Sequence, residues 1–329
     1  MQTHRVKILV IRFSSIGDIV LTTPVLRCLK NQLEGEVEID YLTKKQYKLI
    51  VANNPNVNKV YCIEKSTNEV IENLRKEGYH YIVDLHKNLR SKRVKRQLKV
   101  LSFTFDKLNY KKWLFTKFKI NKLPSIHIVE RYLNAVKPLG VENDNVGLEY
   151  YIPENDKIVI ADLPEFLRNG YIAIAIGAQH NTKCLPTHKI TEICKKLNKP
   201  IILLGGDDDI LKGDDIVNKT SNLVYNACGK FNLNQSASIV KQAEAVITHD
   251  TGLMHIAAAF NKKTISVWGN TVPDFGMYPY IPQALNQSII IENNKLDCRP
   301  CSKIGYDKCP KKHFKCMEEI SVDDIVSKF

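Results

Sequence analysis

Short apolar runs alternate along this chain with longer stretches in which apolar and polar residues mix. A run of four to eight apolar residues between turn residues is typical of a buried strand, and a longer mixed stretch favours a helix. The first such strand is Val6–Phe13, and a helix is predicted to follow it through about Leu33. Strands that alternate with helices in this way predict a parallel sheet with helices on both of its faces.

The same alternation continues through the rest of the chain. Further strands are predicted over Val37–Leu42, Tyr81–Leu85, Tyr171–Ile176, Pro200–Leu204, Leu223–Tyr225, Ala245–Thr248 and Thr264–Trp268. Further helices are predicted over Ile128–Leu139, Thr187–Leu197, the residues after Gly205-Gly206, Asn232–Ala243 and Gly252–Phe260. A polar stretch at residues 142–154 separates the two series and is the best candidate for a linker.

We therefore expect an α/β protein made of two Rossmann-like domains, over residues 1–150 and 151–320, that face each other across a cleft. A C-terminal helix at residues 321–329 is expected to pack back across both domains. In folds of this kind ligands bind at the carboxyl ends of the strands, at the point where the strand order reverses. The loops after the strands are therefore where functional residues are sought.

Composition and charge narrow the class of protein. The 329 residues are 44% apolar and 25% charged, which excludes a disordered chain. The apolar runs are far shorter than the ~20 residues that a membrane-spanning helix needs. The basic start of the chain is not followed by the apolar region of a signal peptide. We expect a cytoplasmic protein.

The net charge of +13 is concentrated in one segment. Lys87–Lys122 holds 13 Lys or Arg residues and a single acid, Asp106. The aromatic residues that lie among them are Phe103, Phe105, Tyr110, Trp113, Phe115 and Phe118. Such a segment is compatible with single-stranded nucleic acid, an anionic membrane surface or a polyanionic substrate as its partner. It is also compatible with a solvated face whose aromatic rings turn inward; we favour an anionic partner.

The nine cysteines fall into two groups. Five are scattered among apolar residues, as reduced core cysteines are. The other four, Cys298, Cys301, Cys309 and Cys316, form a C-x2-C-x7-C-x6-C cluster with His313 nearby. Four thiols are enough to hold zinc, but only the first pair has the spacing of half a zinc knuckle. A loop of reduced thiols and a redox-labile disulfide therefore stay open beside the metal site.

The first strand-to-helix junction is Ser14-Ser15-Ile16-Gly17-Asp18. Its single glycine does not make the G-x-G-x-x-G of a dinucleotide fold, which argues against a nicotinamide or flavin cofactor. Asp18 lies three residues after Ser15 and fits a capping box that stabilises the helix. It also fits a carboxylate at the strand tip that takes a proton from a hydroxyl group.

Two later junctions indicate an anion site. Gly177–Lys183, which includes Gln179, combines a glycine turn with amide, hydroxyl and lysine donors, a set that suits phosphate. In Thr248–His255, Thr251 and Gly252 start a helix whose free N–H groups also attract an anion. Asp250 suits a sugar hydroxyl, and the Asp207–Asp209 run suits a ribose diol.

These motifs carry a resemblance to a known family. The run from Asp250 to Ala259 resembles the D-[ST]-G-x-x-H-x-A-A-A signature of glycosyltransferase family 9, the ADP-heptose:lipopolysaccharide heptosyltransferases. Ile11–Pro24 is similar to the N-terminal motif of that family, and Lys183-Cys184-Leu185-Pro186 to its K-x-W-P. Leu185 stands where the family usually has Trp, and Ile176 where it usually has Pro.

The resemblance implies a GT-B fold and an inverting, metal-independent transfer of a heptose or related sugar, with no cofactor. The donor would be a nucleotide sugar, expected to be ADP-heptose, and the acceptor an anionic lipopolysaccharide core rather than nucleic acid. Asp18 would be the general base and Lys183 would neutralise the leaving diphosphate. The implied donor-binding residues are Gln179, Asp209, Asp250, Thr251, Gly252, Leu253 and His255. The implied acceptor-binding residues are Ser15, Gly17, His86, Lys87 and Arg90.

Two other functions stay open at this point. One is a nucleotide-sugar epimerase of GT-B architecture, which would need further acids and bases around the donor sugar. The other is a non-enzymatic protein that binds polyanions through Lys87–Lys122. Peripheral contact with the cytoplasmic face of the inner membrane is left open as well.

Overall fold

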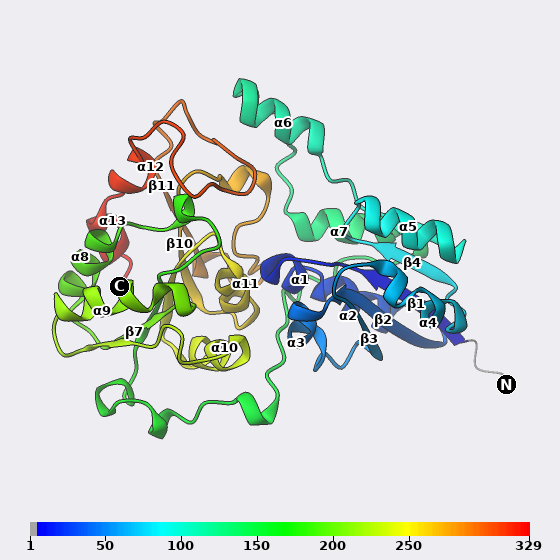
Figure 1. The fold of residues 1–329 in the computed structure, drawn as a ribbon, viewed down its shortest axis with the longest axis horizontal. Coiled ribbons are helices and arrows are strands. Elements are labelled where there is room, and N and C mark those ends of the chain that lie inside the picture. The colour runs from blue at the N-terminus through cyan, green and yellow to red at the C-terminus, as the bar shows by residue number, and fades with distance from the viewer. Residues whose placement is uncertain (1–4) are drawn as a thin grey trace. The chain divides into compact units, whose positions relative to one another are not determined.

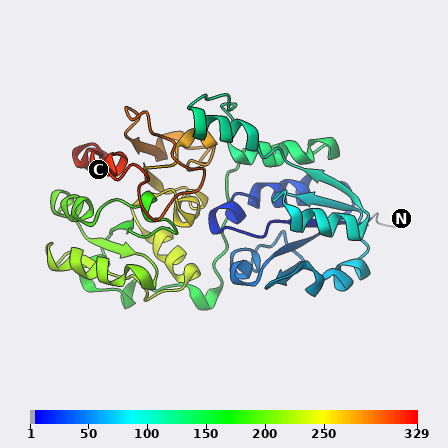
Figure 2. The same cartoon turned by 45° about the horizontal axis from the view of Figure 1, so that its top comes forward.

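Two parallel sheets organise the chain, which the computed structural model describes from Arg5 to Phe329 (Figure 1). The chain divides into two units. The first holds the chain up to Lys107 together with Ile126–Tyr151, and the second holds Leu108–Ser125 together with Ile152–Phe329. Figure 2 shows the helices that cover the two faces of each sheet. The predicted α/β class with two Rossmann-like sheets is confirmed.

The first sheet has the strand order β3-β2-β1-β4-β5, with every pairing parallel. Its strands are β1 (Arg5–Ile11), β2 (Glu36–Lys44), β3 (Lys59–Ile63), β4 (Tyr81–Asp84) and β5 (Leu101–Thr104). The helices of this unit are α1 (Ile16–Val20), α2 (Thr23–Gln32), α3 (Lys48–Val51), α4 (Ile71–Lys76), α5 (Leu89–Leu98) and α7 (Ile128–Val136). The strand order reverses between β1 and β4, so a ligand is expected at their carboxyl ends.

The second sheet has the order β11-β10-β9-β6-β7-β8 and is also parallel throughout. Its strands are β6 (Ile172–Ala175), β7 (Ile201–Leu204), β8 (Val224–Asn226), β9 (Ala245–His249), β10 (Lys263–Trp268) and β11 (Ser288–Glu292). The helices are α6 (Asn109–Phe118), α8 (Thr187–Leu197), α9 (Ile210–Asn218), α10 (Leu233–Gln242), α11 (Gly252–Ala259), α12 (Lys315–Glu318) and α13 (Val322–Val326). This is the full Rossmann strand order, and it reverses between β6 and β9.

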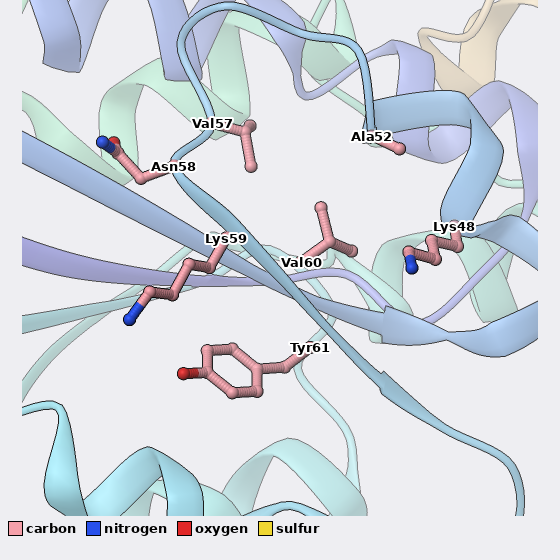
Figure 3. A pocket seen from close by; sticks show the side chains of 7 residues that line it. All are labelled: Lys48, Ala52, Val57, Asn58, Lys59, Val60 and Tyr61. Carbon is pink, nitrogen blue, oxygen red and sulfur yellow. The ribbon is translucent and has the colours of Figure 1, made fainter.

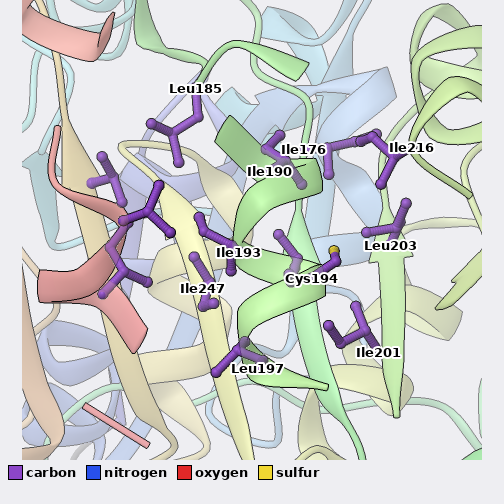
Figure 4. Packing of buried hydrophobic residues seen from close by; sticks show 14 of the residues in the cluster. Ile176, Leu185, Ile190, Ile193, Cys194, Leu197, Ile201, Leu203, Ile216 and Ile247 are labelled. Carbon is purple, nitrogen blue, oxygen red and sulfur yellow. The ribbon is translucent and has the colours of Figure 1, made fainter. Parts of the chain in front are cut away.

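The core of the second unit forms where α8 covers the sheet (Figure 4). Its buried residues follow a helical spacing of three and four: Ile190, Ile193, Cys194 and Leu197. They pack in one cluster with β7 and β9 side chains such as Leu203 and Ile247, and with Val322 and Ile325 of α13. α13 thus packs on α8 within the second unit. Its expected packing across both domains stays a prediction.

One helix prediction is wrong. The single helix expected through Leu33 is two helices, α1 and α2, with a break at Leu21 and Thr22. Pro24 lies in the first turn of α2, where its missing N–H needs no partner. In a continuous helix the proline ring would clash with the carbonyl group of Val20, so the chain ends one helix and starts another.

The basic segment Lys87–Lys122 is divided between the two units. Its first part forms α5 and β5 in the first unit, whereas α6 belongs to the second unit. The Nζ of Lys119 donates to the main-chain oxygens of Cys298 and Pro300, and Asn121 donates to Asp274. The expectation of one domain boundary near residue 150 did not include the assignment of Leu108–Ser125 to the second unit. Within Arg5–Phe329, no helix is both long and apolar enough to span a membrane.

Candidate active site

The first group of predicted site residues lies at the reversal point of the first sheet. β1 leads through Ser14 and Ser15 into α1, which carries Asp18 in its first turn. β4 pairs with β1 and leads to His86 and α5. The two loops touch, because the ring of His86 packs edge-on against Phe13 at 5.1 Å between centroids.

Asp18 is held from two sides. Its Oδ1 is 2.7 Å from the Nη2 of Arg12, and its Oδ2 accepts hydrogen bonds from the N–H and hydroxyl of Ser15, at 3.2 and 2.9 Å. Burial alone would raise the pKa of Asp18, but the Arg12 charge and the Ser15 hydrogen bonds outweigh it and lower the pKa to about 2. The carboxylate is therefore ionised at any physiological pH. This geometry is compatible with both roles of Asp18, as a cap of helix α1 and as a general base.

Arg12 is a residue that the sequence reasoning missed. It is 6% exposed, and it donates to the main-chain oxygens of Ser14 and Leu85 and to the hydroxyl of Tyr132 as well as pairing with Asp18. A buried arginine that holds a carboxylate and two loop carbonyls fixes the shape of this site. The signal available in the sequence was a charged residue near the end of an otherwise apolar predicted strand.

The other predicted acceptor residues lie on the loops and helix starts that follow β1 and β4. Ser15 caps α1, and Gly17 is buried in the helix. The burial of His86 and the positive charges of Arg12 and Lys107 lower the pKa of its imidazole to about 3. The His86 ring is therefore neutral and not a cation. Lys87 and Arg90 are exposed.

The second group lies at the reversal point of the second sheet, between β6 and β9. The Nζ of Lys183 is 2.7 Å from the Oδ2 of Asp250 and 3.1 Å from its main-chain oxygen. The hydroxyl of Thr271 donates to the same Oδ2 at 2.9 Å. Lys183 and Asp250, 67 positions apart in the sequence, thus form one partly buried ion pair. The expected contact of Asp250 with a sugar hydroxyl is a prediction; the described contacts make it the residue that positions Lys183.

The start of α11 completes this group. Thr251 is the N-cap residue in extended conformation, and Gly252 and Leu253 supply the first N–H groups of the helix. These N–H groups and the helix dipole favour an anion beside Lys183. His255 is 2% exposed, on the buried part of α11, and Gln179 is exposed on the loop after β6. The structure therefore brings Lys183 and Asp250 together at the start of α11.

Asp209 lies beneath the loop after β6. It is the buried member of the three aspartates, its Oδ2 accepts from the N–H of Gly206, and its Oδ1 is 3.0 Å from the Nζ of Lys212. A Cβ on Gly177 would come within 1.8 Å of Oδ2, so that only glycine fits there. The expected contact of Asp209 with ribose stays a prediction.

His249 is a second missed residue. It is 1% exposed, and its Nε2 accepts a hydrogen bond of 2.9 Å from the N–H of Leu185. Burial lowers the pKa of this imidazole to about 4, so the ring is neutral and its Nδ1 carries the proton. The end of β9 therefore holds the loop that carries Lys183. The histidine was visible in the motif, but its partner could be found only in the fold.

The cysteines of the cluster and the residues that line the cavity are not members of these two groups. Cys298 Sγ is 3.9 Å from the Nε2 of His313, and the thiols between Arg5 and Phe329 are all unpaired. No three His, Cys, Asp or Glu side chains in that range are arranged to hold a metal ion.

A cavity of about 400 Å³ lies along the edge strand β3 (Figure 3). It is lined by Lys48, Ala52, Val57, Asn58, Lys59, Val60 and Tyr61. None of these is a predicted site residue.

Comparisons with known proteins agree with this architecture. The sequence model of the family described as glycosyltransferase family 9 (heptosyltransferase) matches residues 68–311. The chain is 25% identical over 295 residues to lipopolysaccharide heptosyltransferase 1 of Campylobacter coli, covering 80% of this chain and 84% of that protein.

Solved structures share the fold. The structure of E. coli ADP-heptose lps heptosyltransferase II matches with a TM-score of 0.73 and 19% identity, over 98% of this chain and 97% of that one. The E. coli heptosyltransferase WaaC with ADP matches with a TM-score of 0.68 and 19% identity, over 98% of each chain. These likenesses give the two-domain GT-B fold.

Proposed function

Because the chain belongs to glycosyltransferase family 9, the heptosyltransferases, we propose that it transfers a heptose from ADP-heptose to a lipopolysaccharide core acceptor. The relatives are lipopolysaccharide heptosyltransferases by name, and one solved structure of the same fold contains ADP. The observation that carries the proposal is the Lys183–Asp250 pair beside the N-terminus of α11. A fixed ammonium group and free N–H groups at one reversal point are what a nucleoside diphosphate requires.

The proposed reaction is a single displacement. An acceptor hydroxyl attacks the anomeric carbon of the heptose, the bond from that carbon to the diphosphate oxygen breaks, and ADP leaves with the electron pair. The acceptor proton passes to the Asp18 carboxylate as the new bond forms. With a pKa of about 2, Asp18 is a weak base in the ground state and accepts the proton only when the hydroxyl has become acidic late in the transition state.

Lys183 is proposed to neutralise the charge that develops on ADP, together with the N–H groups of Thr251, Gly252 and Leu253. One such preorganised donor is typically worth about 3–4 kcal/mol of barrier. Gln179, Asp209 and His255 complete the proposed donor site. Lys183 and the N–H groups at the start of α11 supply positive charge without a divalent ion, so we propose that transfer is metal-independent.

The acceptor is proposed to bind at the first reversal point. Lys87 and Arg90 would bind its anionic groups, and neutral His86 would offer a hydrogen bond. Ser15 and Gly17 shape the loop that carries Asp18. We further propose a cytoplasmic enzyme in peripheral contact with the inner membrane, since unpaired thiols are typical of a reducing compartment and the acceptor is a lipid conjugate.

A panel of nucleotide sugars with truncated core acceptors tests this function, each reaction being run with and without EDTA. Mass spectrometry of the acceptor is expected to show the addition of one heptose unit with ADP-heptose, at the same rate in both conditions. Elemental analysis of the protein after EDTA treatment separates loss of a structural metal from loss of a catalytic one. An epimerised donor with an unchanged acceptor would contradict the transferase. Full loss of transfer in EDTA with rescue by magnesium would contradict the metal-independent mechanism.

A further inference from the structure

Helix α6 exposes an aromatic cluster. It buries none of its residues, and Tyr110, Trp113 and Phe118 are 70%, 47% and 54% exposed. The ring centroids of Tyr110 and Trp113 are 6.0 Å apart, and those of Trp113 and Phe118 are 5.2 Å apart. Three large side chains thus form one continuous exposed apolar surface, a kind of patch that marks an interaction site.

The opposite face of α6 is attached to the second unit. The ring of Phe115 meets that of Phe275 at 6.0 Å, and the Nζ of Lys112 lies 5.6 Å from the centre of the same ring. Lys119, one turn further along, donates to main-chain oxygens of the Cys298–Pro300 loop. At 100° per residue, positions 112, 115 and 119 share one face, and positions 110, 113 and 117 share the other. The helix is therefore anchored on one side and presents the aromatic cluster on the other.

The segment that carries this cluster has charged residues of one sign only. Residues 108–125 contain five lysines and no acid. Lys112 and Lys119 belong to the anchored side, which leaves Lys111, Lys117 and Lys122, all exposed. Lysines beside exposed Trp, Tyr and Phe are typical of helices that lie in the interface of an anionic bilayer, where the rings enter the headgroup layer and each lysine adds attraction.

We propose that the aromatic-lysine face of α6 docks this enzyme on an anionic lipid bilayer. The proposal rests on the proposed function only in that a membrane-anchored acceptor makes such docking useful. Single-stranded nucleic acid fits less well, because the Tyr110 and Trp113 rings lie nearly parallel, 26° apart, and cover each other instead of offering open faces to bases. A second copy of the chain fits less well too, since a two-fold contact would set these lysines against each other.

Vesicle binding by the full-length chain tests the proposal. The vesicles are phosphatidylethanolamine with a minor fraction of phosphatidylglycerol, and pure phosphatidylcholine, in about 0.1 M and about 0.5 M salt. Trp113 is a built-in probe, because the only other tryptophan, Trp268, is 1% exposed. The variants are K111E/K117E and W113A/F118A. Their matched controls are K195E/K199E, which reverses two exposed lysines elsewhere in the second unit, and L211A, which removes an exposed apolar side chain on α9.

We expect binding to the anionic vesicles at low salt, with a blue shift of tryptophan emission that W113F abolishes. Each α6 variant should weaken binding by at least about tenfold, while both controls bind like wild type. Transfer to a lipid-free core acceptor should be unchanged in every variant, which separates this proposal from the proposed function. Vesicle binding that α6 variants do not alter, or no binding at all, would overturn the proposal. So would α6 variants that change only the oligomeric state in light scattering.

Discussion

Replacing Lys183 with methionine is expected to lower kcat by about 10²–10³-fold, because the leaving diphosphate loses its fixed cation where charge develops. Methionine keeps much of the side-chain volume, so the fold should persist. The loss should be larger in kcat than in donor affinity, since the charge on ADP grows in the transition state. Steady-state kinetics with ADP-heptose, together with donor binding by calorimetry, measure both quantities.

The matched control is Lys189→Met. Lys189 also lies in the second unit, and its Nζ also donates to a main-chain oxygen, that of Ile320. Its loss removes one lysine and one hydrogen bond away from the reversal point, so kcat should stay within about twofold of wild type, as for surface changes in general. Equal effects of the two substitutions would refute a specific role for Lys183.

Replacing Asp18 with asparagine is expected to lower kcat by about 10²–10⁴-fold, the usual worth of general-base help. Donor affinity should hardly change, because the donor residues lie in the second unit. Stability should fall by about 1–3 kcal/mol, since buried Arg12 loses its ionised partner. The folded-state pKa is below the unfolded value of 3.8, so this stabilisation is present above about pH 4 and is lost as pH falls toward 2. The difference in melting temperature between wild type and variant should therefore shrink below pH 4.

Glu69→Gln is the control that separates the capping role of Asp18 from its role as a general base. Glu69 accepts from the N–H of Ser66 three residues earlier, as Asp18 does from Ser15. Neighbouring N–H groups hold the pKa of Glu69 below its usual range, so its loss should also lower stability. Because Glu69 lies at no reversal point, kcat should not change. An Asp18→Asn enzyme whose kcat stays within about threefold of wild type would leave Asp18 with a capping role alone.

Periodicity predicted the elements whose burial is regular. α8 has the predicted bounds Thr187–Leu197, because its buried side chains recur at helical spacing. The edge strands β3 and β5 were not predicted; both are only partly buried, and in β5 a serine interrupts the apolar residues. α6 was not predicted either, because it buries no residue. The apolar pattern was not sufficient for every element of the core, since α4 was not predicted although it buries Ile71 and Leu74.

Some residues of the candidate site could be predicted from local motifs, whereas the contacts between them could not. Local motifs indicated Asp18, Lys183 and Asp250, because strand-to-helix junctions can be located in a sequence. The pairing of Lys183 with Asp250 depends on β6 lying beside β9, and that neighbourhood is set by the sheet order. The same holds for Arg12, which reaches Leu85 after β4, and for His249, which reaches Leu185. Contacts across neighbouring strands could not be predicted without the fold.

The anomeric configuration of the transferred heptose tests the central claim most directly. A single displacement assisted by Asp18 must invert the configuration at the anomeric carbon, because the acceptor attacks opposite the departing diphosphate. Nuclear magnetic resonance of the wild-type product, compared with the ADP-heptose donor, measures this. The mechanism predicts complete inversion. Retention would contradict it, because retention requires a covalent intermediate or attack from the side of the leaving group, and neither uses Asp18 as proposed.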